Sequence, residues 1–140
     1  MWTLRPAQMQ DRARVTALWE AAGLGSITAQ EWTALVAGTS ATVIVADDAG
    51  VLVGAAVGSF DGWRAYIYHV AVVPDRQHEG LGRALMREAE RHLERAGARR
   101  VYVMIHEENT AGLALASSSG YVPDGELALM KALVSAAALA

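Results

Sequence analysis

Cysteine is absent from this chain, and aromatic residues and proline are scarce. The 140 residues include no Cys, one Phe and three Pro, and aromatic residues make up only 6% of the total. The absence of cysteine excludes disulfides, a thiol nucleophile and metal sites built on cysteine. It is also compatible with a reducing compartment, so the cytoplasm is the expected location.

Long apolar runs and a basic charge excess are missing as well. No apolar stretch reaches the roughly 18 residues of a membrane-spanning helix, and residues 1–6 lack the apolar stretch of a signal peptide. A formal net charge of −3 disfavours nonspecific nucleic-acid binding, which requires a basic surface. The four histidines are scattered without metal-ligand spacing. We therefore expect no metal, no membrane and no nucleic-acid partner.

The chain does contain enough apolar residues, 53% of the total, for one compact domain. A domain of this size buries about two thirds of its unfolded surface. We expect that domain to span residues 1–134, with residues 135–140 forming a frayed tail.

Periodicity predicts the order of the elements. Asp11 is expected to cap the first helix, and residues 28–31 fit a capping box before the second. The prediction is an α/β (α+β) fold: a mixed, mostly antiparallel sheet of about six to seven strands, with about four helices packed on it. The expected strands are residues 3–6, 42–47, 51–60, 66–73, 101–105 and 126–133, and the expected helices are residues 12–22, about 32–36, 83–96 and 109–118.

The most informative motif is Gln-His-Glu-Gly-Leu-Gly at residues 77–82, between an apolar strand and an amphipathic helix. The first N–H groups of a helix have no internal partner, and the helix dipole favours an anion there. Gly80 and Gly82 let the backbone approach a ligand closely. The motif is neither a P-loop nor a dinucleotide fingerprint, since the required glycine spacings are absent.

The pattern Gln77-x-x-Gly80-x-Gly82 instead resembles the coenzyme A pyrophosphate loop of the GNAT superfamily of acetyl-CoA-dependent N-acetyltransferases, and the predicted element order is similar over nearly the whole chain. The residues Asp61-Gly62-Trp63-Arg64 look like a hairpin found in a bacterial subgroup. The resemblance implies that the strand before the loop binds pantetheine, the loop binds pyrophosphate and an asparagine faces the CoA arm. These roles fall on Val70, Ala71, Val72, Val73, Gln77, His78, Glu79, Gly80, Leu81, Gly82, Arg83 and Asn109.

The chain departs from the family where the proton donor is expected. Ala116 occupies the position of the usual tyrosine acid, and Met104 that of a glutamate base in some members. The remaining catalytic candidates are Tyr66 and Tyr68, which share one strand face, and His106. His69 is expected to point the other way unless a bulge reorients it.

Asp61 and Arg64 leave two interpretations open. Asp-Gly is typical of a hairpin turn, and Arg64 would then be a surface residue. Alternatively, Arg64 lies at the mouth of the acceptor site and binds a carboxylate.

The function that the resemblance implies is transfer of acetyl from acetyl-CoA to a primary amine, by direct attack in a ternary complex. The first alternative is a non-catalytic acyl-CoA-binding sensor or partner module, suggested by Ala116. The second is a structural domain with a vestigial loop, which is disfavoured because the glycines and Asn109 remain. A homodimer is expected only because two-fold assemblies are common.

Overall fold

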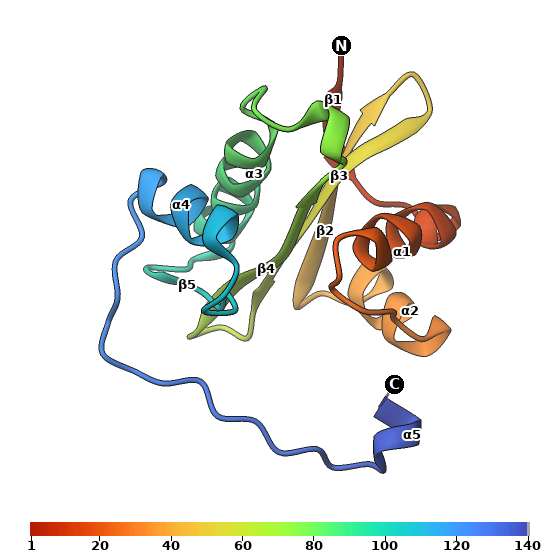
Figure 1. The fold of residues 1–140 in the computed structure, drawn as a ribbon. Helices are drawn as coiled ribbons and strands as arrows, with labels where there is room; N and C mark the ends of the chain where they lie inside the picture. Colours follow the sequence, from red (N-terminus) through yellow and green to blue (C-terminus); the bar gives the residue numbers. More distant parts are fainter. Residues whose placement is uncertain (140) are drawn as a thin grey trace.

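A five-stranded mixed sheet forms the centre of the fold (Figure 1). The computed structural model describes residues 1–139, and the strands lie in the order β1-β2-β3-β4-β5. The first four strands pair antiparallel, whereas β4 and β5 pair parallel. The bounds are Thr3–Pro6 (β1), Ala41–Asp48 (β2), Val51–Phe60 (β3), Ala65–Val72 (β4) and Val101–Val103 (β5).

Helices cover both faces of this sheet. Figure 1 shows α1 and α2 on one side and α3 and α4 on the other. The helices are Arg12–Ala21 (α1), Ala29–Ala37 (α2), Leu81–Ala96 (α3), Thr110–Ser118 (α4) and Ala136–Leu139 (α5), with 3₁₀ turns at Met9–Asp11 (η1) and Pro74–Arg76 (η2).

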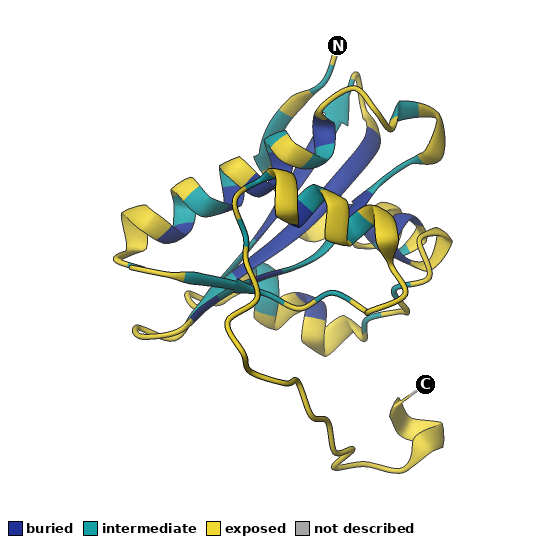
Figure 2. Ribbon diagram, turned by 60° about the vertical axis from the view of Figure 1, so that its left-hand side comes forward, coloured by how far each residue is buried: buried dark blue, intermediate teal, exposed yellow. Residues whose placement is uncertain are grey.

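The central strands are apolar on both faces because each face has its own helical layer. In β2, Val43 and Val45 pack with α1 and α2, whereas Ile44 and Ala46 pack with α3. Successive strand residues point to opposite faces, so a strand covered on both sides has a continuous apolar sequence. Figure 2 shows the buried residues concentrated in the sheet between these layers.

Helix α3 joins this core through one apolar face. Its buried residues are Leu81, Leu85, Met86, Ala89 and Leu93. Gly97 ends the helix with φ 109°, a left-handed conformation that favours glycine. On the outer face Arg91 lies 2.7 Å from Glu88, as expected for a solvated, charged face.

The two predicted helix caps have different outcomes. The capping box is confirmed: the Glu31 N–H donates to Thr28 Oγ1 at 3.1 Å, and the Thr28 N–H donates to Glu31 Oε1 at 2.9 Å. Asp11 stands at the N-cap of α1, but its side chain makes no capping hydrogen bond. Its fully buried carboxylate instead accepts from Arg5, at 2.8 Å, and from Arg14. The prediction of a side-chain cap at Asp11 was therefore wrong, because Arg5, Arg14 and the Gln8 N–H occupy the carboxylate.

The predicted number of strands and helices also needs correction. The described residues form five strands and five α-helices, rather than six to seven strands and four helices. Residues 126–133 form no strand, since they run outside the sheet and have no pairing partner. Strand β5 ends at Val103 instead of residue 105, and the short helix α5 lies within the expected tail.

Within residues 1–139, no helix combines the length and hydropathy needed to cross a membrane. The same stretch contains no group of three or more His, Asp or Glu side chains placed to hold a metal ion.

Candidate functional site

Strands β4 and β5 separate partway along their length. Their register runs only from Ala65 opposite Val101 to Ile67 opposite Val103. Beyond Ile67, β4 continues to Val72 with β3 on one side and no strand on the other. The backbone of this part of β4 therefore offers hydrogen-bonding groups to an extended ligand.

A groove of about 680 Å³ lies along this unpaired edge. It runs from β4 over the loop before α3 to the start of α4. Its lining comprises Ala22, Leu24, Val70, Ala71, Val72, Arg76, Gln77, His78, Gly80, Leu81, Gly82, Arg83, Asn109, Ala111, Gly112 and Leu115. The groove thus gathers most of the residues expected to bind CoA, while Val73 and Glu79 lie outside its lining.

The loop before α3 has an unusual backbone. His78 has φ 67° and Gly80 has φ 81°, both left-handed. Such residues turn successive N–H groups toward one concave side, which favours anions. Gly80 is also the N-cap of α3, so the helix begins at the loop with its unpaired N–H groups. The arrangement combines a helix N-terminus and a concave backbone in one anion-binding position.

Side chains around the loop hold it in place. Gln77 Nε2 donates to the Val72 carbonyl at 3.2 Å, which ties the loop to the end of β4. Arg76 lies 2.7 Å from Asp48 and 3.3 Å from Glu79. Gln77 and Glu79 therefore brace the loop, in addition to any backbone role.

Close packing explains the glycine at position 82. A Cβ atom there would lie 3.1 Å from a Leu115 methyl group, tighter than most real contacts. At Gly80 no atom lies within 4 Å of an added Cβ, so crowding does not require glycine there. Glycine is favoured at this position by the left-handed backbone. Nearby, Asn109 Oδ1 accepts the Gly112 N–H at 2.9 Å, so Asn109 caps α4 while lining the groove.

A β-bulge interrupts β4 beside the groove. Ala55 pairs with Ala71 and Val57 with Tyr68, so β4 has one extra residue between these positions. His69 lies in this bulge with φ 53°. Its ring packs edge-on against Trp19, at 5.2 Å, and Trp19 Nε1 donates to the His69 carbonyl at 2.9 Å. The bulge thus turns His69 to the same side of the sheet as Tyr68, the exception that the sequence analysis allowed.

A second pocket, of about 400 Å³, lies on that side of the sheet. It is built from β4, α1, α2 and the connection between the two helices. It adjoins the groove, because neighbouring residues line different cavities. Leu24 and Val70 line the groove, whereas Gly25 and His69 line the second pocket. The lining comprises Trp19, Gly25, Ser26, Ile27, Glu31, Ala34, Leu35, Tyr68 and His69.

Burial sets the protonation states in this pocket. It lowers the pKa of the His69 imidazole, an effect that a hydrogen bond with the Leu24 backbone only partly opposes. Burial also raises the pKa of the Tyr68 hydroxyl. Hydrogen bonds from Thr28 lower the pKa of Glu31 on the pocket rim. At neutral pH the pocket therefore holds a neutral imidazole, a protonated phenol and a carboxylate.

Other candidates lie away from this pocket. His106 is exposed beyond the end of β5 and accepts the Glu108 N–H at Nδ1, at 3.2 Å. Tyr66 stacks obliquely on Tyr102 with ring centres 5.8 Å apart. Neither residue lines the groove or the second pocket. Because β5 ends at Val103, His106 does not continue that strand, and its catalytic role stays a prediction.

The two positions that depart from the family pattern also lie apart from the cavities. Met104 is 57% exposed after the end of β5, and Ala116 is buried in α4. Neither lines the groove or the second pocket.

The hairpin residues form their own cluster. Asp61 Oδ1 accepts the N–H groups of Trp63 and Arg64, both at 2.8 Å, so Asp61 builds the turn. The Arg64 guanidinium lies 5.4 Å from the Trp63 ring centre and 5.8 Å from that of Tyr102. These contacts account for both residues without a ligand.

Sequence reasoning missed the helical side of the site. Leu24 and Leu115 line the groove, and Glu31 lines the second pocket. Glu31 was interpreted only as part of a capping box. The glycines at positions 23 and 25 were the one available signal, since they mark an irregular connection between two helices.

Comparison with known proteins agrees with this geometry. Residues 8–121 match the model of the Acetyltransferase (GNAT) family.

The chain belongs to the acetyltransferase (GNAT) family.

The curated relatives of this GNAT chain include acetyltransferase YE1169 of Yersinia enterocolitica, which is 30% identical over 91 residues. That match covers 65% of this chain and 64% of the relative. A solved putative acetyltransferase from Agrobacterium tumefaciens is 21% identical, with a TM-score of 0.78 over 93% of this chain and 99% of that one. A predicted acetyltransferase from Clostridium acetobutylicum, solved with acetyl-CoA, is 12% identical, with a TM-score of 0.78 over 94% and 96%. At these identities the solved structures establish the fold.

Proposed function

We propose that this GNAT protein transfers the acetyl group of acetyl-CoA to a primary amine, by direct attack while both substrates are bound. The observation that carries the proposal is the continuity of the groove, the left-handed loop and the pocket around His69. The groove suits a long, amide-bearing, anionic donor, and the pocket suits a small cationic acceptor. We further propose membership of the bacterial subgroup with the Asp-Gly-x-Arg hairpin, and a cytoplasmic location.

Acetyl-CoA would lie along the groove. The unpaired edge of β4 would pair with the amides of the pantetheine arm. The loop from His78 to Gly82 would hold the pyrophosphate on backbone N–H groups at the start of α3. This end of the groove is open, since an added Cβ at Gly80 would meet nothing within 4 Å. The residues present therefore fit the CoA arm.

The amine would enter through the second pocket. An ammonium group has a pKa of about 10.4 in water and must lose a proton before attack. Glu31 on the pocket rim would attract the cation, and the neutral imidazole of His69 would accept its proton. This assigns the role of general base to a residue that was expected to point away from Tyr68 unless a bulge reoriented it.

The remaining steps use the same section of β4. The strand ladder has no partner for His69 and Val70, which leaves the Val70 N–H as the candidate donor to the thioester oxygen as it gains negative charge. The amine nitrogen bonds to the carbonyl carbon, the carbon–sulfur bond breaks, and sulfur leaves as the CoA thiolate. Tyr68, whose raised pKa keeps it protonated, would donate to that sulfur and regain a proton when the nitrogen of the new amide loses its second proton.

The test is release of free CoA thiol from acetyl-CoA in the presence of a panel of primary amines, with acetyl-CoA binding measured separately by calorimetry. We expect saturable turnover with at least one amine. Tight binding without turnover by any amine would favour the non-catalytic acyl-CoA-binding module. No binding of acetyl-CoA would overturn both functions.

A further inference from the structure

The second pocket carries one fixed negative charge. Glu31, on the exposed rim, is the only Asp, Glu, Lys or Arg among the described residues that line it. The capping box holds this carboxylate in place, since Glu31 Oε1 accepts the Thr28 N–H at 2.9 Å. The hydrogen bonds from Thr28 also lower the pKa of Glu31, so the carboxylate is ionised at neutral pH. The pocket therefore presents a permanent negative charge that no cation of its own lining neutralises.

The imidazole of His69 lies at another part of the same pocket. Trp32, the neighbour of Glu31 in α2, has its ring centre 6.5 Å from that of Trp19. The Trp19 ring centre in turn lies 5.2 Å from that of His69, so an indole stands between the start of α2 and the bulge of β4. Glu31 is exposed, whereas His69 is half-buried beside the groove. A nitrogen that reacts beside His69 therefore lies away from the Glu31 carboxylate.

The rest of the pocket is mostly apolar. Apart from Glu31, Tyr68 and His69, the lining residues are Trp19, Gly25, Ser26, Ile27, Ala34 and Leu35. Such a lining suits methylene groups, whereas the hydroxyl groups of a sugar would find few hydrogen-bond partners. The volume of about 400 Å³ is near the lower end of the range of about 300 to 1,000 Å³ that is typical of ligand sites. The pocket therefore suits a small, unbranched alkyl group.

The same lining disfavours an acceptor that carries a carboxylate. No Lys or Arg of the described residues lines the pocket. Arg12 donates to the Ile27 carbonyl at 3.4 Å but is not part of the lining. The carboxylate of an amino acid would therefore meet the charge of Glu31 without a counter-ion, and like charges at close range repel.

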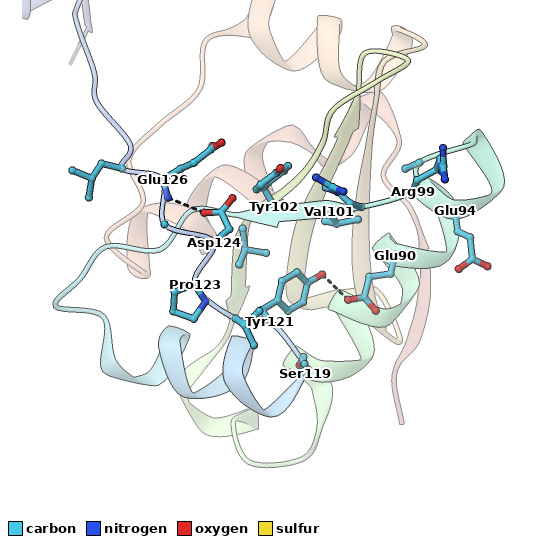
Figure 3. Close-up of a pocket in the computed structure, with 17 residues that line it drawn as sticks. Glu90, Glu94, Arg99, Val101, Tyr102, Ser119, Tyr121, Pro123, Asp124 and Glu126 are labelled. Atoms are coloured by element: carbon cyan, nitrogen blue, oxygen red, sulfur yellow. Dashed lines mark hydrogen bonds between the residues drawn. The ribbon is translucent and has the colours of Figure 1, made fainter.

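Carboxylates also gather elsewhere, in a cavity of about 1090 Å³ beside β5 and α3. Its acidic residues are Glu90, Glu94, Asp124 and Glu126 (Figure 3). There Glu90 accepts the Tyr121 hydroxyl at 2.6 Å, and Arg99 and Arg100 line the same cavity. This cavity shares no lining residue with the groove or the second pocket. An amine bound there would lie away from the thioester, so Glu31 is the carboxylate that matters for the acceptor.

Resting on the proposed function, we infer that the acceptor is an unbranched alkane with an amino group at each end, one held by Glu31 and the other acetylated beside His69. The single carboxylate matches the one ammonium group that stays charged during the reaction. The apolar lining matches the methylene chain between the two nitrogens.

The reaction acetylates one end of this diamine. Both ends enter protonated, and His69 takes a proton from the near ammonium. The neutral nitrogen bonds to the acetyl carbon as the carbon–sulfur bond breaks. That nitrogen then loses its second proton, which replaces the proton that Tyr68 gives to the CoA sulfur. The products are CoA thiol, a proton released from His69 and a monoacetylated diamine whose far ammonium is unchanged.

The first test compares diamines of three to eight carbons with monoamines of the same length, by thiol release from acetyl-CoA. We expect the best diamine to exceed its monoamine in kcat/KM by about fivefold, the upper end of what an exposed ion pair contributes. The preference should shrink at high salt, because Glu31 is exposed and its charge is screened. Equal kcat/KM for diamines and monoamines would overturn this inference alone. No turnover of any amine would overturn the proposed function as well.

The second test removes the charge with Glu31→Gln. Glutamine also completes a capping box, so α2 should keep its start, and circular dichroism checks the fold. We expect the ratio of diamine to monoamine kcat/KM to fall to about one, since no charge is left to hold the far ammonium. Glu20→Gln is the matched control and should keep the ratio of the parent, because Glu20 is exposed on α1 and lines neither cavity. An unchanged ratio in Glu31→Gln, or the same loss in Glu20→Gln, would overturn the inference.

Discussion

Replacing His69 with Asn removes the proposed proton acceptor and leaves the backbone supported. His69 has φ 53°, and Asn tolerates the left-handed region better than most residues. A positioned general base contributes on the order of 10² to 10⁴ in rate, which corresponds to about 2.7 to 5.5 kcal/mol in the activation free energy. We expect kcat to fall by at least about 10² for the amine substrate.

The proposed role of His69 also predicts how activity and stability depend on pH. Burial lowers the pKa of His69 below its usual 6.5, so the imidazole is a free base at pH 7. Activity of the parent should fall as pH drops through that lowered pKa, and His69→Asn should lose this acid limb. The same group should reduce the free energy of unfolding as pH falls below 6.5, because the unfolded state then binds the proton more readily.

The assay is thiol release over a range of pH, with acetyl-CoA affinity measured by calorimetry. Acetyl-CoA binding should not change, since His69 does not line the groove. His92→Asn is the matched control: His92 lies on α3, across the sheet, 3.4 Å from Glu88. If His69→Asn keeps the kcat and the pH profile of the parent, the proposed role of His69 is refuted.

Four further predictions address the rest of the protein. Gly82→Glu adds a carboxylate to the anion-binding turn and crowds Leu115, so calorimetry should show acetyl-CoA affinity at least tenfold weaker, about 1.4 kcal/mol; unchanged affinity would remove the loop from the site. Tyr68→Phe should lower kcat by about 10² or more with acetyl-CoA binding intact, and a near-parent kcat would mean that the thiolate leaves unprotonated. If Arg64 binds an acceptor carboxylate, Arg64→Ala should raise the KM for the acceptor and leave the other kinetic parameters unchanged. The same KM in variant and parent would mean that Arg64 only contributes to the hairpin. Asp11→Asn leaves Arg5 without its buried partner and should reduce the free energy of unfolding by about 3 kcal/mol. This value is near the lower limit for broken buried ion pairs, because Arg5 is partly exposed. A denaturant titration that shows no change would refute a stabilising role for the Arg5–Asp11 pair.

Local sequence signals predicted the elements whose causes are local. The capping box at Thr28 formed because all its donors and acceptors lie within four residues. Helix α3 formed because its apolar spacing matches the helical period, and its end at Gly97 follows from a residue that tolerates φ 109°. The family and the architecture could be inferred for the same reason, since glycine spacing and the order of elements are properties of the chain itself.

Contacts between distant residues limited the remaining predictions. Asp11 was interpreted as a cap because its partner Arg5, on β1, comes beside it only when β1 and α1 are placed together. The strand before His106 was predicted to reach residue 105 instead of Val103, because the end of β5 cannot be located from an apolar run. Residues 126–133 have the pattern of a strand, but pairing depends on a neighbour that their sequence does not specify.

The sequence by itself determined the family, the glycine loop at the start of α3 and the apolar faces of the helices and strands. These follow from short-range spacing and backbone freedom. Only the tertiary structure decided which side of the sheet His69 faces, because one extra residue in β4, held by Trp19 from α1, reverses the alternation. Only the tertiary structure showed that residues 126–133 run outside the sheet and that β5 lies at its edge. Both are relations between parts of the chain that are distant in sequence, and such relations depend on packing rather than on local pattern.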